Sequence, residues 1–177
     1  MDSSESPVAA PTQLADPTLL DHEAGVVSLY GAENITFIVW HGQPNEHAVD
    51  RLHRITERRR RQFPNGISVV HVVKGNIALP DQTTREAFVR LMKSSNGALA
   101  CVAVVVGGTG FWASAARSLI TSLRVLARGE FDMRLHGEIA EVVKWLPERH
   151  AARTGVHMDA AQLAHVLRFV ESAPASH

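Results

Sequence analysis

The chain has little that would mark it as secreted or membrane-bound. It contains one cysteine, Cys101, so no intrachain disulfide can form, which favours a reducing compartment. Its longest apolar run covers residues 98–106, far short of the roughly 20 residues that a membrane helix requires. The N-terminal residues lack the basic segment and apolar stretch of a signal peptide. The sequence therefore predicts a soluble, cytoplasmic protein in which Cys101 is buried and inert.

The chain also lacks an excess of either charge. Lysine and arginine number 18 together, as do aspartate and glutamate, so the formal net charge is zero. A neutral chain has no overall attraction to nucleic acid or anionic lipid, and we expect no nucleic-acid partner. The four arginines at 58–61 end an expected helix, where they complement its dipole and face solvent. An acidic partner protein is the alternative interpretation of this basic run.

Recognisable catalytic and metal-binding motifs are missing as well. The ten histidines form no HExxH or HxH pattern, and His47 and His53 lie on different faces of an expected helix. No Ser/His/Asp triad or carboxylate pair follows from a sequence motif. We expect no catalytic residue, no metal ion and no cofactor, and a protein that is not an enzyme. An enzyme that joins His41 or His71 to a carboxylate is the remaining alternative.

What the sequence does contain is an alternation of β-branched runs with segments of helical periodicity. Strands are expected at residues 25–30, 35–40, 67–73, 99–106 and 131–135, and helices at 45–62, 81–93, 111–128, 138–146 and 159–170. The first two strands form a hairpin, and the later ones alternate with helices. The sequence therefore predicts an α/β fold, with a mixed, largely parallel sheet and packed helices.

The ends of the chain differ in composition from its centre. Residues 1–22 are rich in Ser, Pro, Ala and Asp, which bury too little surface to order a segment, and are expected to form a disordered tail. The α/β domain is expected at 23–150, an additional helix packed on it at 151–172, and a second tail at 173–177.

This order of elements resembles the STAS domain, the SpoIIAA-like fold of anti-sigma factor antagonists and sulfate transporters. The ending FDMRLHGEIAEVVKWL at residues 131–146 carries the resemblance further, because a short strand leads into an acidic helix start and a Trp-Leu pair. The resemblance covers about residues 25–147. It implies a non-enzymatic regulatory module that binds a partner protein or itself through the helix faces at 83–93 and 114–124.

The resemblance also implies where a phosphorylation switch would lie. In anti-sigma factor antagonists, a Ser or Thr at the start of the helix after the third strand is phosphorylated. The corresponding stretch runs from Lys74 to Thr84 and lacks the Asp-Ser-Ser-like turn of the family. Thr83 and Thr84 are its nearest hydroxyls, and the alternative is that Asp81 or Thr83 caps the helix.

A glycine-rich turn, Gly107, Gly108, Thr109 and Gly110, joins a buried strand to a long helix. Backbone N–H groups at such a helix start bind phosphate or carboxylate, and Arg117 would add a positive charge. Binding of a small anionic ligand at this turn, or of an apolar one if the likeness of SpoIIAA-like relatives to lipid-transfer domains applies, is the alternative function of the chain. Chain reversal and close packing are the structural alternative.

The same long helix carries a row of small polar residues. Ser114, Ser118 and Ser122 are spaced by four and share a face, with Arg117 and Arg124 about a turn away. Small side chains let another backbone approach closely, so this face is expected to contact a partner protein or a second copy of the chain. A solvated face or one packed on the sheet is the alternative.

Overall fold

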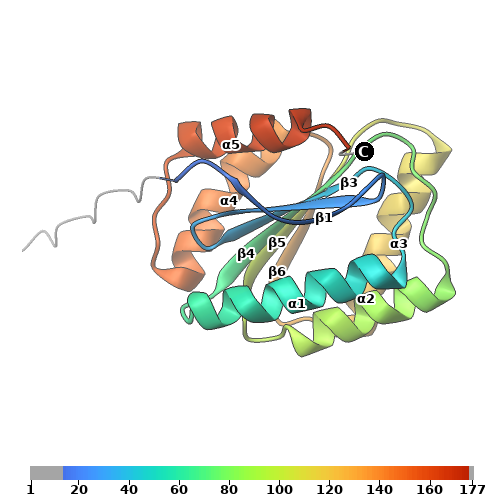
Figure 1. Cartoon of the computed structure of the whole chain (residues 1–177), viewed down its shortest axis with the longest axis horizontal. Helices are drawn as coiled ribbons and strands as arrows, with labels where there is room; N and C mark the ends of the chain where they lie inside the picture. The colour runs from blue at the N-terminus through green and yellow to red at the C-terminus, as the bar shows by residue number, and fades with distance from the viewer. Residues whose placement is uncertain (1–13, 176–177) are drawn as a thin grey trace, which may run out of the picture.

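The computed structural model describes residues 14–175, which fold into an α/β domain of six strands and five helices (Figure 1). The strands are β1 (Thr18–Glu23), β2 (Val27–Ala32), β3 (Ile35–Trp40), β4 (Ile67–Val73), β5 (Leu99–Val106) and β6 (Asp132–His136). The helices are α1 (Glu46–Gln62), α2 (Gln82–Ser94), α3 (Phe111–Ala127), α4 (Ile139–Thr154) and α5 (Ala160–Ser172). None of these helices combines the length and apolar content needed to cross a bilayer.

All six strands form one sheet, in which they lie side by side in chain order. The strands β1 to β3 pair antiparallel, and β3 to β6 pair parallel, so the expected mixed sheet is confirmed. Three helices connect the parallel strands. Because crossovers of one hand place their helices on one face, α1, α2 and α3 cover one side of the sheet. The helices α4 and α5 cover the other side (Figure 1).

Each face of the sheet builds its own hydrophobic core. Toward α4 and α5, Phe37 and Val70 pack with Leu146 and Leu167, and all four are fully buried. Toward α1, the buried residues Ile38 and Val104 share a core with Leu52 and other α1 side chains. Burial on both faces explains why β4 and β5 are almost continuous runs of apolar residues, many of them valine.

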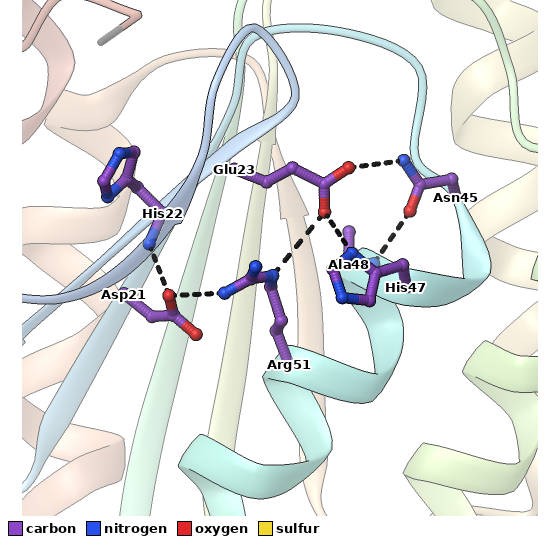
Figure 2. A network of polar contacts seen from close by, with 7 residues as sticks. All are labelled: Asp21, His22, Glu23, Asn45, His47, Ala48 and Arg51. Carbon is purple, nitrogen blue, oxygen red and sulfur yellow. Dashed lines mark hydrogen bonds and ion pairs between the residues drawn. The ribbon is translucent and has the colours of Figure 1, made fainter.

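The strand β1 corrects the expectation of a disordered tail through residue 22. Residues 18–23 pair antiparallel with β2, while residues 1–13 lie outside the described part of the chain. The strand has few apolar residues, so its composition did not indicate burial. It is anchored by polar side chains instead: Arg51 on α1 donates to Asp21 at 2.7 Å, and Asn45 donates to Glu23 at 2.9 Å (Figure 2).

Asn45 and Glu23 also organise the start of α1. The Asn45 side chain caps the helix by accepting the backbone N–H of Ala48 at 2.8 Å, at the residue where the sequence analysis begins this helix. The second oxygen of Glu23 lies 3.1 Å from His47 Nδ1 (Figure 2). The edge strand and the first helix are thus held together by a shared set of polar contacts.

The end of α4 is a second correction. This helix was expected to end at residue 146, before Pro147, but it continues to Thr154 with Pro147 inside it. A proline in a helix interior removes one hydrogen bond and costs roughly 3 kcal/mol. Here the buried side chains of Leu146, His150 and Thr154, spaced by four, line one face against the core and hold the last turns in place.

The C-terminal helix is placed as the sequence predicted, with Leu163, Val166, Leu167 and Val170 buried in the core shared with α4. The expected tail from 173 begins too early, however. Ala173 is buried, and its carbonyl accepts a hydrogen bond from Lys74 Nζ at 2.6 Å. The chain therefore remains attached to the sheet just past the end of α5.

Candidate functional site

A partly enclosed apolar cavity of about 140 Å³ lies between the sheet and the helices α2 and α3. The helix α1 contributes Leu52, which is buried, and Thr56 to the lining. Phe88 and Leu91 of α2 and Ile120 of α3 face the same core and are only half-buried. All three also line the cavity.

The sequence explains why α3 leaves this space. Among the α3 residues that line the cavity is Ala116, which is buried. An alanine contributes only a methyl group, so the volume that a leucine would fill stays open. Ala116 is therefore the natural position at which to close the cavity by mutation.

The segment between β4 and α2 forms another part of the wall. Residues 77–80 line the cavity, and their backbone is held by side chains from elsewhere. Trp112 of α3 donates its indole N–H to the Ile77 carbonyl at 2.8 Å, and Gln43 donates to the Leu79 carbonyl at 2.9 Å. The cavity wall is thus tied to α3 and to the loop after β3.

His71 is the one ionisable side chain among the residues that line the cavity. The strand register places it between Ile38 of β3 and Val104 of β5, on the face toward α2 and α3. Protein atoms surround most of the imidazole. The ring also lines the cavity and keeps some accessible surface. Burial lowers the pKa of His71 to about 4, so its imidazole is neutral at physiological pH.

Trp40 fixes the orientation of this imidazole. Its indole Nε1 donates a hydrogen bond to His71 Nδ1 at 3.1 Å. The two rings lie nearly parallel, with an interplanar angle of 4° and centroids 6.4 Å apart. The Trp40 ring also meets Phe88 of α2 edge-on at 5.8 Å, so the pair connects the sheet to the helix that covers it.

The predicted ligand turn lies beside this cavity. Gly107, Gly108, Thr109 and Gly110 are exposed, and the turn joins two lining residues, Val106 and Trp112. Gly108 and Gly110 have φ angles of 81° and 94°, and a Cβ on either would meet open space. These two glycines are therefore required for the chain reversal and not for close packing, which corrects that part of the structural alternative.

Arg117 reaches the turn, where its side chain bonds to backbone carbonyls of the chain itself. Its guanidinium donates to the carbonyls of Val106 at 2.9 Å and Gly108 at 3.2 Å. The side chain therefore holds the turn in shape, and its remaining donors face outward on an exposed surface. Binding of an anionic ligand at residues 107–110 stays a prediction.

The residues of the predicted phosphorylation switch are only partly brought together. Asp81 caps α2 by accepting the Thr84 backbone N–H at 2.8 Å, and this bond lowers the pKa of its carboxyl, so the capping alternative is confirmed. Thr84 is 1% exposed, whereas Thr83 is exposed to solvent. Lys74 contacts the end of α5 instead. Of the two hydroxyls, Thr83 alone is accessible to a modifying enzyme.

The predicted contact face of α3 is exposed. Ser114, Ser118, Ser122 and Arg124 all face solvent, and Ser122 donates its hydroxyl to the Ser118 carbonyl at 2.9 Å. Large apolar side chains, which the sequence analysis did not single out, flank them: Phe111 is 91% exposed, Val125 69% and Leu126 61%. The packing alternative is wrong for this face, because these residues point away from the sheet.

The histidines outside the cavity separate rather than converge. His41 lies 3.1 Å from the Ser28 hydroxyl, and His47 contacts Glu23. Within residues 14–175, no group of His, Cys, Asp and Glu side chains is arranged to hold a metal ion.

Among the four arginines at 58–61, Arg59 departs from the expected solvated helix end. It is buried and donates to the Thr36 hydroxyl at 3.2 Å and to the Ile35 carbonyl at 2.9 Å.

Sequence reasoning missed a buried polar chain on the opposite face of the sheet. His150 Nδ1 lies 2.7 Å from the Ser68 hydroxyl, which lies 3.1 Å from Cys101 Sγ. His150 Nε2 lies 3.0 Å from Asn34 Oδ1, and the Asn34 amide nitrogen donates to the Gly66 carbonyl. Because Asn34 Oδ1 must accept, His150 Nε2 carries the proton, Ser68 donates to Nδ1 and the thiol donates to Ser68.

This chain has the residue types of a nucleophile–histidine–amide site but not its accessibility. Ser68, Cys101 and His150 are all fully buried. Burial raises the pKa of the Cys101 thiol to about 11 and lowers the pKa of His150 to about 4. The group therefore acts as a structural link between the β2–β3 turn, β4, β5 and α4. The expectation of a buried cysteine is confirmed.

In comparisons with known proteins, no family model matches this chain and no curated protein has a similar sequence. The resemblance to STAS domains stays a prediction.

Proposed function

We propose that this protein binds a small apolar molecule in the cavity between the sheet and the helices α2 and α3. The observation that carries the proposal is the cavity itself, whose walls are apolar side chains left half-buried by the surrounding helices. A dry apolar cavity of roughly 150 Å³ binds benzene or xenon in an engineered protein. Filling the space with a ligand would bury the remaining apolar surface of Phe88, Leu91 and Ile120 and stabilise the fold.

The lining favours binding over catalysis. His71 is its one ionisable group, and no carboxylate, amine or thiol shares the cavity with it. General acid–base catalysis uses a positioned proton donor or acceptor whose pKa lies near the working pH, and burial moves His71 away from that range. The proposed role is therefore that of a carrier or sensor, in line with the expectation of a non-enzymatic protein.

The test is an NMR titration of the full chain with benzene. The indole N–H signals of Trp40 and Trp112, which both line the cavity, should shift and saturate. Bound benzene should also raise the unfolding temperature by mass action. Ala116→Leu fills the cavity and should abolish both effects. Thr121→Leu, on an exposed position of α3 outside the lining, is the matched control and should bind like the parent chain.

Two results would refute the proposal. One is the absence of any shift at the solubility limit of benzene. The other is equal binding by the parent chain and by a folded Ala116→Leu variant, because the site would then lie elsewhere. The spectrum of the ligand-free variant shows whether it is folded, so a failure to fold is separated from a failure to bind.

A second candidate function, self-association through α3, is favoured by its exposed apolar residues. Phe111 lies seven residues before Ser118 and Val125 seven residues after it, so a two-fold axis at Ser118 would bring Phe111 of one copy opposite Val125 of the other. The small residues Ser114 and Ser122 would allow two antiparallel helices to approach closely. We propose a homodimer with this arrangement as the partner-binding role expected from the sequence.

Sedimentation equilibrium of the full chain tests this arrangement. The parent chain should sediment as a dimer and Val125→Asp as a monomer, because a carboxylate would be buried opposite an aromatic ring. Leu19→Asp, an exposed apolar position on β1, is the control and should remain dimeric. A parent chain that stays monomeric at high concentration would refute the dimer.

A further inference from the structure

The imidazole of His71 presents a hydrogen-bond donor at the cavity wall. An indole N–H donates and never accepts, so the bond from Trp40 Nε1 requires His71 Nδ1 to be the acceptor. A neutral imidazole carries one proton, which must therefore be on Nε2. Trp40 thus selects the tautomer of His71 in which Nε2–H is the donor.

This donor has no protein partner in residues 14–175, although His71 lines the cavity. Two other polar groups of the lining already donate hydrogen bonds within the protein. Trp112 donates to the Ile77 carbonyl, and the Ser95 hydroxyl donates to the Leu91 carbonyl at 2.8 Å. The Thr56 hydroxyl is the remaining polar group in the lining. A ligand with a hydrogen-bond acceptor would supply a partner for the His71 donor inside the apolar cavity.

We propose that the ligand is a neutral, mostly apolar molecule with one hydrogen-bond acceptor, such as a ketone, ester or ether, and that His71 Nε2–H recognises this acceptor. The inference rests on the proposed function. An anionic acceptor is disfavoured because no lysine or arginine lines the cavity, so a carboxylate would lose its hydration without gaining a counter-charge. A hydrocarbon fills the same space but leaves the donor unsatisfied.

Cyclohexanone and methylenecyclohexane provide a matched pair of probes, since the second replaces the carbonyl oxygen by a CH₂ group of similar shape. Their dissociation constants are measured by NMR titration of the full chain. The quantity of interest is the preference, defined as the dissociation constant of the hydrocarbon divided by that of the ketone. The preference is compared between variants, because the hydration of the two free molecules then cancels.

In His71→Phe, which keeps an aromatic ring and removes the donor, the preference for the ketone should fall about tenfold. In Thr56→Val, which removes the other polar lining group, it should remain that of the parent chain. An unchanged preference in His71→Phe, or a loss in Thr56→Val alone, would overturn the recognition by His71. If neither molecule binds the parent chain, the proposed function itself fails.

A second measurement does not depend on the folding of any variant. In the parent chain, the proton resonance of His71 Nε2–H should move on addition of cyclohexanone and should move far less with methylenecyclohexane. Equal changes with both molecules would contradict a hydrogen bond to the carbonyl, while still supporting binding in the cavity.

Discussion

The indole of Trp40 and the imidazole of His71 occupy neighbouring parallel strands and are joined by a hydrogen bond of 3.1 Å from Nε1 to Nδ1. The first prediction concerns the proton on this ring. Nitrogen-detected NMR should show His71 as the neutral Nε2–H tautomer from pH 7 down to near its pKa of about 4. Trp40→Phe removes the donor and should yield a mixture of tautomers. Detection of the Nδ1–H form in the parent chain would contradict the assignment.

The second prediction is a loss of stability at mildly acidic pH. Burial lowers the pKa of both His71 and His150 from 6.5 to about 4 in the folded protein. As the pH falls, the unfolded chain is therefore protonated at these sites before the folded chain is. The contribution of these sites to the free energy of unfolding should be complete above pH 6.5 and should decrease as the pH falls toward 4. The slope should reach up to about 1.4 kcal/mol per pH unit for each histidine.

Urea unfolding at a series of pH values measures this slope. The carboxyls whose pKa values are lowered, including those of Asp81 and Glu141, add to the loss from about pH 4.5 downward, where the unfolded chain begins to protonate them. His41 and His136, whose pKa values burial also lowers, contribute to the same slope, so His71→Phe should reduce the slope without abolishing it and serves as the internal control. A free energy of unfolding that is constant between pH 6.5 and 4.5 would be inconsistent with neutral buried histidines.

The third prediction concerns the reactivity of Cys101. Its thiol is fully buried, and its pKa is raised to about 11 by burial, so very little thiolate is present at neutral pH. A thiol-specific reagent should modify the native protein only as fast as the chain opens, and should react at once in denaturant. Fast modification of the native protein would show that the polar chain of Ser68 and His150 is accessible.

The fourth prediction concerns Pro147, which lies inside α4. Pro147→Ala restores a backbone N–H that can donate to the carbonyl of Val143, four residues earlier. The half-buried position has room for the smaller side chain, so the substitution should raise the free energy of unfolding by about 1–3 kcal/mol. Thermal unfolding of the two proteins measures this difference. A lower unfolding temperature for Pro147→Ala would mean that the proline ring contributes packing that outweighs the missing hydrogen bond.

Much of the fold follows from local patterns in the sequence. The apolar strands β4 and β5 and the start of the first helix near residue 45 were predicted where the structure has them. The strand β1 was missed because polar contacts to Arg51 and backbone pairing hold it, and neither leaves an apolar pattern. The length of α4 was missed because tertiary packing of His150 outweighs the local effect of Pro147.

The cavity is harder to predict than the elements around it. Helical periodicity identifies the inward residues of α2, such as Phe88 and Leu91, but not how closely the helix approaches the sheet. That distance depends on how side chains from several elements fit together, including the small Ala116 of α3. One signal was available: His71 interrupts a largely apolar strand, and a polar residue facing a core requires a partner.

The order of the strands has a consequence for the assembly of the domain. Each strand pairs with the one that precedes it in the chain, so no strand has to be inserted between two that are already joined. The sheet can therefore grow in the direction of synthesis, from the β1–β2 hairpin to β6. The exception is the core on the side of α4 and α5. There α5 must pack against β3, and the residue after it must bond to Lys74, before the core is complete. A ribosome-bound chain that lacks this last helix would expose the apolar side chains of Phe37 and Val70. Completion of folding therefore depends on the packing of the C-terminal helix.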